Sequence, residues 1–368
     1  MPAPCRAPIF LAPALDRPEL VRELLERTAP HFPVQRYFQS GAEMRAQSGP
    51  AALIIAPNFR ADWATADARV EGIEPILENP RFIEAAAKLF GSDLVCPWGV
   101  YSNITWQLPF DQGRGHTDVP AFVGVDRRHH PTWLLSVMGH SRLFEKERVE
   151  IATAVAWFYR GRDGGFSYWP DGPEHPPRLH EGDVFNTAIM GDNDRMYHRV
   201  RPVGARKDGM LGGMTLETRL EHDGGDAWAI REAGETHARM SFDALRISVS
   251  WKGYVYRDAE QRRRHEAGGG GLDLDQVIGR FGSDLAARGI AFQAPADPFH
   301  DEAFIELLTR AYVRDRPSSR PEAPDSEKEV PWTRCCSKRR AGSPCSRSTD
   351  RRDSTRSRSR CSRSSPSA

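Results

Sequence analysis

Hydrophobic and polar positions change their period along this chain, and the change divides it into regions. Over Asp16–Thr28 apolar residues recur at helical spacing, Pro18 suits a first helical turn, and the leading aspartate is placed to cap it. A second helix is predicted from Asn79, as N-cap, to a stop at Gly91. Residues 1–94 are therefore expected to form a helical and mixed flank.

Short β-rich runs separated by Gly, Pro, Asp and Asn fill residues 95–257. β-Branched and aromatic content, with alternation in several runs, marks six candidate strands. They are Val100–Leu108, Ala152–Tyr159, Arg178–Asn186, His198–Val203, Met210–Leu220 and Leu245–Tyr256. Short strands at this spacing favour a sandwich or barrel over a parallel α/β sheet. One charged interruption, Ser141–Val149, has a more helical pattern and is expected as an insertion.

Helical periodicity returns near the C-terminal end. Helices are predicted over Leu272–Arg288, with Gly289 as the stop, and over Asp301–Val313. Residues 258–315 should therefore form a C-terminal helical segment. Residues 316–368 are rich in Pro, Ser, Arg and Lys and nearly devoid of apolar residues, so this tail is expected to be disordered.

Charge and cysteine content restrict the class of protein. From Arg334 onward there are eleven Lys and Arg against two Asp, so a total charge of +1 leaves the preceding residues at −8. An acidic body gives no support to nucleic-acid binding, although the Arg-Ser pairs of the tail keep an RNA-binding role open as an alternative. Four of the six cysteines lie in the tail, which excludes a dense disulfide framework and favours a reducing, cytoplasmic setting. No apolar run is long enough for a membrane span.

Two histidines and one carboxylate stand in an order typical of a non-haem iron(II) site. His116 and Asp118 are two residues apart, so a strand, or a strand end running into a turn, can direct both toward one metal. His198 would reach the same metal from a neighbouring strand. This ligand set leaves one face of the iron open for oxygen and a cosubstrate. A second pair of this spacing, in His300-Asp301-Glu302, begins an amphipathic helix, where first-turn acids are explained by the helix dipole.

The succession of motifs behind His116 resembles the Fe(II)- and 2-oxoglutarate-dependent dioxygenase superfamily, in particular prolyl hydroxylase and phytanoyl-CoA hydroxylase-like enzymes. The motifs are His116-Thr117-Asp118, Ala156-Trp157-Phe158-Tyr159 with Gly164-Gly165-Phe166, Pro177 to Phe185, His198-Arg199-Val200 and Arg246-Ile247-Ser248. The resemblance covers about residues 95–257. It implies a mainly β fold with flanking helices, built on a double-stranded β-helix (jelly-roll, cupin-like) core.

The same resemblance implies a reaction. His116, Asp118 and His198 would be the metal-binding and catalytic residues, holding Fe(II) with 2-oxoglutarate as cosubstrate. With O2 the enzyme would form succinate and CO2 and hydroxylate a C–H bond. Asp118 favours hydroxylation over halogenation, because halogenating members carry a small residue there. A small-molecule substrate is favoured, since no peptide-binding or carrier-binding module is recognisable.

Two arginines are candidates to anchor 2-oxoglutarate, because a guanidinium binds a carboxylate at two points and keeps its charge. Arg246 with Ser248 has the family's Arg-x-Ser motif, whereas Arg206 stands at the usual distance after the distal histidine. We prefer Arg246, which requires an insertion near Leu220–Ser241. The alternative function is a non-catalytic, cupin-like barrel that binds metal without turning over 2-oxoglutarate.

One predicted strand could supply further contacts to 2-oxoglutarate or substrate, depending on which of its faces points inward. Asn103, Thr105 and Gln107 alternate with apolar residues, so one of the two sets must face the interior. If the polar set faces inward, it can contact 2-oxoglutarate or substrate; otherwise the strand is simply half-exposed.

Overall fold

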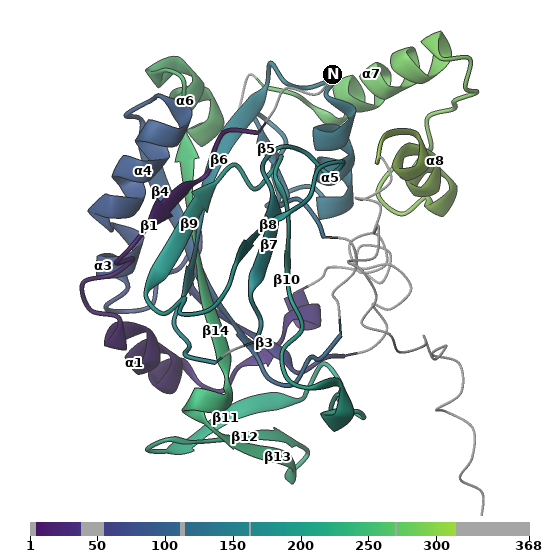
Figure 1. Ribbon diagram of the computed structural model, residues 1–368. Coiled ribbons are helices and arrows are strands. Elements are labelled where there is room, and N and C mark those ends of the chain that lie inside the picture. Colours follow the sequence, from purple (N-terminus) through teal and green to yellow (C-terminus); the bar gives the residue numbers. More distant parts are fainter. Residues whose placement is uncertain (1–4, 38–54, 111–114, 162, 269–270, 314–368) are drawn as a thin grey trace, which may run out of the picture. The chain divides into compact units, whose positions relative to one another are not determined.

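The computed structural model describes residues 5–37, 55–110, 115–161, 163–268 and 271–313 (Figure 1). The strands are β1 Ile9–Leu11, β2 Phe32–Pro33, β3 Asn58–Ala64, β4 Val95–Thr105, β5 Ala121–Phe122, β6 Arg148–Trp157, β7 Phe166–Trp169, β8 Arg178–His180, β9 Thr187–Gly191, β10 Tyr197–Val200, β11 Arg219–Gly224, β12 Ala227–Glu232, β13 Glu235–Ser241 and β14 Arg246–Val255. The α-helices are α1 Glu19–Thr28, α3 Glu74–Leu77, α4 Pro80–Phe90, α5 Thr132–Ser141, α6 Ala259–Glu266, α7 Leu274–Ala287 and α8 Glu302–Tyr312. The predicted tail, residues 316–368, lies outside the described residues.

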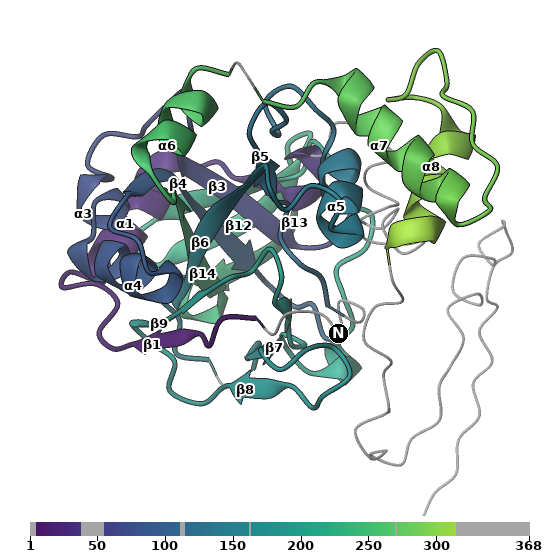
Figure 2. The same ribbon diagram turned by 90° about the horizontal axis from the view of Figure 1, so that it is seen from above.

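The main sheet is antiparallel and has the order β1-β9-β6-β14-β4-β3-β2, with β5 paired to β6. Alternation along β14 gives the sheet two different faces. Ile247, Val249 and Trp251 are buried in the largest apolar cluster, together with residues of α1, α3 and α4. These helices lie along one face of the sheet in both views (Figures 1 and 2). The opposite, inner face of β14 carries polar side chains at the even positions.

A small antiparallel sheet, β10-β7-β8, packs against the inner face of the main sheet. The contact is an apolar cluster in which Trp157 of β6 and Ile189 of β9 meet Phe166 of β7. The observed fold is thus mainly β, with antiparallel sheets and flanking helices. This confirms the fold class expected from the sequence.

Two further groups of elements complete the described chain. Strands β11, β12 and β13 form a separate antiparallel sheet between β10 and β14. This sheet occupies the region, near Leu220–Ser241, where an insertion was expected if Arg246 is the anchor. Helices α5, α7 and α8 share their own apolar cluster, which includes Trp133, Phe281 and Phe304. No helix in the described ranges combines the length and apolar composition that a membrane span needs.

Four of the six predicted strands lie close to where the structure has them, as β4, β6, β10 and β14, while two were wrong in extent. The run Met210–Leu220 is irregular until β11 begins at its end, because no neighbouring strand pairs with it. The run Arg178–Asn186 breaks after β8, where Gly182 adopts a φ of +90° that a strand does not accommodate.

The predicted helices were likewise right in part. Asn79 caps α4 and Gly91 ends it in the left-handed conformation, as expected. The helical character assigned to Ser141–Val149 was wrong, because α5 ends at the first of these residues and β6 begins at Arg148. Asp16 does not cap α1: its carboxylate accepts a hydrogen bond from Arg81 at 2.7 Å instead.

Candidate metal centre

Backbone pairing brings the two halves of the predicted ligand set together. The amide of His116 donates to the carbonyl of His198 at 3.0 Å, and the reverse hydrogen bond measures 2.9 Å. Two residues on, the amide of Asp118 donates to the carbonyl of Asn193 at 2.8 Å. Gly115 permits this close approach, because its φ is +88° and a Cβ there would lie 3.1 Å from the His198 carbonyl oxygen. The glycine of the motif therefore lets the segment bearing His116 pair with β10.

The side chains of His116, Asp118 and His198 converge, and one ligand atom from each lies within 4.8 Å of the others. Asp118 Oδ1 is 3.5 Å from His198 Nε2, and the two imidazole rings are 4.5 Å apart. His198 Nδ1 is 2.9 Å from the Met196 carbonyl oxygen. Because a carbonyl only accepts, Nδ1 carries the proton and Nε2 keeps its lone pair for a metal. His198 is buried and His116 is exposed, so the group opens on the side of His116.

A buried lysine that the sequence analysis missed lies against this group. Lys252 Nζ on β14 donates to Asp118 Oδ2 at 2.7 Å and to Thr153 Oγ1 at 3.0 Å. Burial by itself would raise the pKa of Asp118, but the Lys252 ammonium holds the pKa of this carboxyl well below its ordinary value. The signal was present in the sequence, because Lys252 continues the inward-facing polar positions of β14 that begin at Arg246.

Arg246 lies at the other end of that row and is 2% exposed. Its Nε donates to the Gly164 carbonyl at 2.6 Å, and its Nη1 donates to Ser248 Oγ at 3.1 Å. Its Nη2 is buried without a hydrogen-bond partner among the described residues, and burial lowers the pKa of this guanidinium. Arg206, the other candidate anchor, is exposed on a 3-10 turn. Arg246 is thus a buried cation with one donor group uncommitted.

The polar residues of β4 share the inner face with this row. Thr105 stands opposite Arg246 and Asn103 opposite Ser248 in the register of β4 and β14. Residues directly opposite each other project to the same side of a sheet, so the polar set of the alternating strand faces inward. Gln107 lies beyond the end of β4, with a φ of +45°.

Asp194, a second buried carboxyl that interacts electrostatically with Lys252 and Asp118, has no hydrogen-bond partner for either oxygen in the described structure. The Arg148 guanidinium lies 3.8 Å from Asp194 Oδ2 but donates to the Asp194 backbone carbonyl instead. Burial therefore dominates and raises the pKa of Asp194 to about 8.

This raised pKa predicts a pH-dependent stability. Between the ordinary pKa of 3.8 and about 8, folded protein keeps a proton on Asp194 that unfolded protein has released. The free energy of unfolding therefore falls as pH rises through this window, by at most about 1.4 kcal/mol per pH unit for one proton. In Asp194→Asn that contribution is expected to vanish, giving a flatter profile between pH 5 and 8. Chemical unfolding of both metal-free proteins across this range measures the difference; parallel profiles would contradict the assignment.

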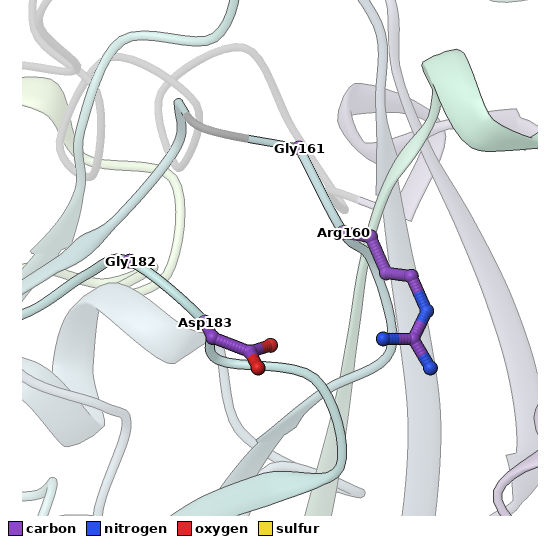
Figure 3. A pocket seen from close by; sticks show the side chains of 4 residues that line it. All are labelled: Arg160, Gly161, Gly182 and Asp183. Carbon is purple, nitrogen blue, oxygen red and sulfur yellow. The ribbon is translucent and has the colours of Figure 1, made fainter.

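A separate open hollow is lined by Arg160, Gly161, Gly182 and Asp183, and Figure 3 shows the two charged side chains at its wall. The Arg160 guanidinium lies 3.9 Å from the centre of the Phe185 ring. No predicted site residue lines this hollow.

The sequence matches no known family profile and no curated protein. Among solved structures, similarity is found to a 2OG-Fe(II) oxygenase family oxidoreductase from Burkholderia pseudomallei, at 14% identity and TM-score 0.35, covering 69% of this chain and 88% of that one. A prolyl hydroxylase from Trichoplax adhaerens, in complex with a hypoxia inducible factor peptide, gives 10% identity and TM-score 0.35, covering 70% and 86%. HygX from Streptomyces hygroscopicus, with nickel, 2-oxoglutarate and hygromycin B bound, gives 9% identity and TM-score 0.35, covering 68% and 83%.

Proposed function

We propose that this chain is an Fe(II)- and 2-oxoglutarate-dependent dioxygenase that hydroxylates a C–H bond of a small molecule. The observation that carries the proposal is Arg246, a buried guanidinium with an uncommitted Nη2, on the same strand face as the lysine that contacts Asp118. Burying a cation without an anion is costly, and a barrel that only binds metal has no need of one. A ligand carboxylate would offset that cost.

The residues present fit both Fe(II) and 2-oxoglutarate. Two imidazole nitrogens and one carboxylate oxygen, all within 4.8 Å of one another, are a donor set suited to Fe(II). The Arg246 fork suits the distal carboxylate of a 2-oxoacid, since charge-assisted pairs of this kind are strong and directional. When bound, iron and 2-oxoglutarate would supply oxygen activation, yielding succinate, CO2 and a hydroxylated product.

The chain's own residues would position and shield these groups. Arg246 would hold the distal carboxylate, and Ser248, which accepts a hydrogen bond from Arg246 Nη1, would fix the direction of the guanidinium. Trp157 and Phe166, with ring centres 5.3 Å apart, fill the space between the two sheets with apolar groups and so limit water there. The exposed side of His116 would be left for the approach of substrate.

A small polar substrate is supported by the inner face of β3. Arg60 and Asp62 stand opposite Asn103 and Tyr101, so they share the face that carries Ser248. Arg60 donates to Asp62 at 2.8 Å and lies 3.8 Å from the centre of the Tyr101 ring. Both charged side chains keep some exposure, 18% and 24%, and so remain accessible to a hydrogen-bonding ligand.

The test is an anaerobic titration of the full chain with Fe(II) and then 2-oxoglutarate. We expect the weak visible charge-transfer band of a 2-oxoacid chelated to Fe(II), followed by succinate formation when O2 is admitted. A panel of small polar molecules can then be screened for increased succinate release. Iron binding with neither band nor succinate would overturn the proposal and favour the non-catalytic barrel.

A further inference from the structure

We propose that Lys252 is a positioning residue for the metal ligand Asp118. By holding Oδ2, it would leave Oδ1 as the single oxygen that Asp118 presents to the metal. The inference rests on the proposed metal site and adds a residue to it.

The two oxygens of Asp118 have different partners. Oδ2 lies 2.7 Å from Lys252 Nζ, whereas Oδ1 lies 3.5 Å from His198 Nε2 and so faces the other ligands. The Lys252 side chain is only 8% exposed, so water cannot easily replace the carboxylate as its partner. Turning both oxygens toward a metal would leave the buried Lys252 ammonium without its anionic partner, which is strongly unfavourable. The carboxylate is therefore constrained to bind through one oxygen.

The backbone and a second tether hold Lys252 in place. The lysine lies on β14 between β4 and β6, where it stands opposite Gly99 and Thr153. Its Nζ donates to Thr153 Oγ1 at 3.0 Å, and Thr153 is itself 1% exposed. The ammonium is thus fixed by the centre of the main sheet rather than by a loop.

Single-oxygen binding has a consequence for the reaction. The proposed cosubstrate and oxygen would need positions on the metal that the protein leaves free, so each protein ligand should contribute a single atom. A carboxylate that bound through both oxygens would take up one of those positions. Lys252 would therefore preserve an open coordination position.

The opposing possibility is that the ammonium only repels a metal ion. Thr153→Val separates the two effects, because it loosens the tether and leaves the positive charge in place. Positioning predicts weaker metal binding in this variant, whereas pure repulsion predicts no change. Lys252→Met removes both tether and charge.

The experiment measures Co(II) affinity of the full chain by chelator competition, with the visible Co(II) spectrum as a readout of coordination. Lys252→Met is expected to bind Co(II) about 10–100-fold more weakly, the usual cost of removing an outer partner of a metal ligand, and with a changed spectrum. Thr153→Val should show a smaller loss in the same direction. Lys146→Met, at an exposed lysine, is the matched control and should behave as the wild type.

Each result is decisive. Wild-type affinity and spectrum in both variants, or tighter binding in Lys252→Met with no change in Thr153→Val, would overturn the role of Lys252. If Lys252→Met fails to fold by circular dichroism, Thr153→Val alone decides. A wild type that binds no Co(II) would instead refute the proposed metal site itself.

Discussion

Replacing His198 with alanine is expected to abolish metal binding and 2-oxoglutarate turnover. His198 is buried, and the contact of its Nδ1 with the Met196 carbonyl fixes the ring, so that Nε2 is held 3.5 Å from Asp118 Oδ1. Losing an outer partner of a ligand typically costs 10–100-fold in metal affinity, and losing a ligand should cost more than about 100-fold. Equilibrium titration with Fe(II) and Co(II), together with succinate formation, measures both effects.

The chain supplies its own control for this prediction. His300 has the same spacing to a carboxylate as His116, but its side chain is 80% exposed and pairs with Asp297 at 3.0 Å. The Asp301 carboxylate accepts from the Phe304 amide and caps α8. His300→Ala should therefore leave metal binding unchanged. Equal losses in the two variants, or metal binding retained in a folded His198→Ala, would show that the ligand set is wrongly assigned.

Strands with clear alternation and their own turn signals were predictable from sequence. The apolar residues of β14 recur at every second position, and the observed strand begins within a residue of the predicted one. A strand was wrongly predicted over Met210–Leu220 because apolar residues recur along this run. In the structure Leu216 is 38% exposed, and a glycine pair interrupts the run. Whether such a run becomes a strand depends on a partner elsewhere in the chain.

In the candidate site too, some residues could be predicted from the local sequence and others could not. His116 and Asp118 form a local motif, and the spacing that makes it recognisable is the spacing that lets both reach one metal. The contact between Lys252 and Asp118 joins residues 134 positions apart, through the pairing of β14 with its neighbours. Local periodicity carries no information on that pairing. The one hint in the sequence was that Lys252 continues the row of polar residues at the even positions of β14, after Arg246, Ser248 and Ser250.

The second large effect is expected at Arg246. Arg246→Met should weaken 2-oxoglutarate binding by about 100-fold or more and leave Fe(II) affinity near the wild-type value. Truncating one partner of a buried, hydrogen-bonded charge pair costs about 2–5 kcal/mol, and each 1.4 kcal/mol is about tenfold in affinity. The guanidinium contacts Gly164 and Ser248 but none of the three ligands, so the metal site should persist. The charge-transfer titration gives the affinity, and KM for 2-oxoglutarate should rise more than kcat falls.

Arg206→Met is the matched control, because it removes the other candidate anchor from an exposed turn. Arg246→Lys should recover only part of the affinity, since an ammonium keeps the charge but cannot bind a carboxylate at two points. A loss confined to Arg206→Met would transfer the anchor to that residue. Normal 2-oxoglutarate binding in a folded Arg246→Met would leave the buried guanidinium without a ligand to explain it, and the case for a 2-oxoacid at this site would fail with it.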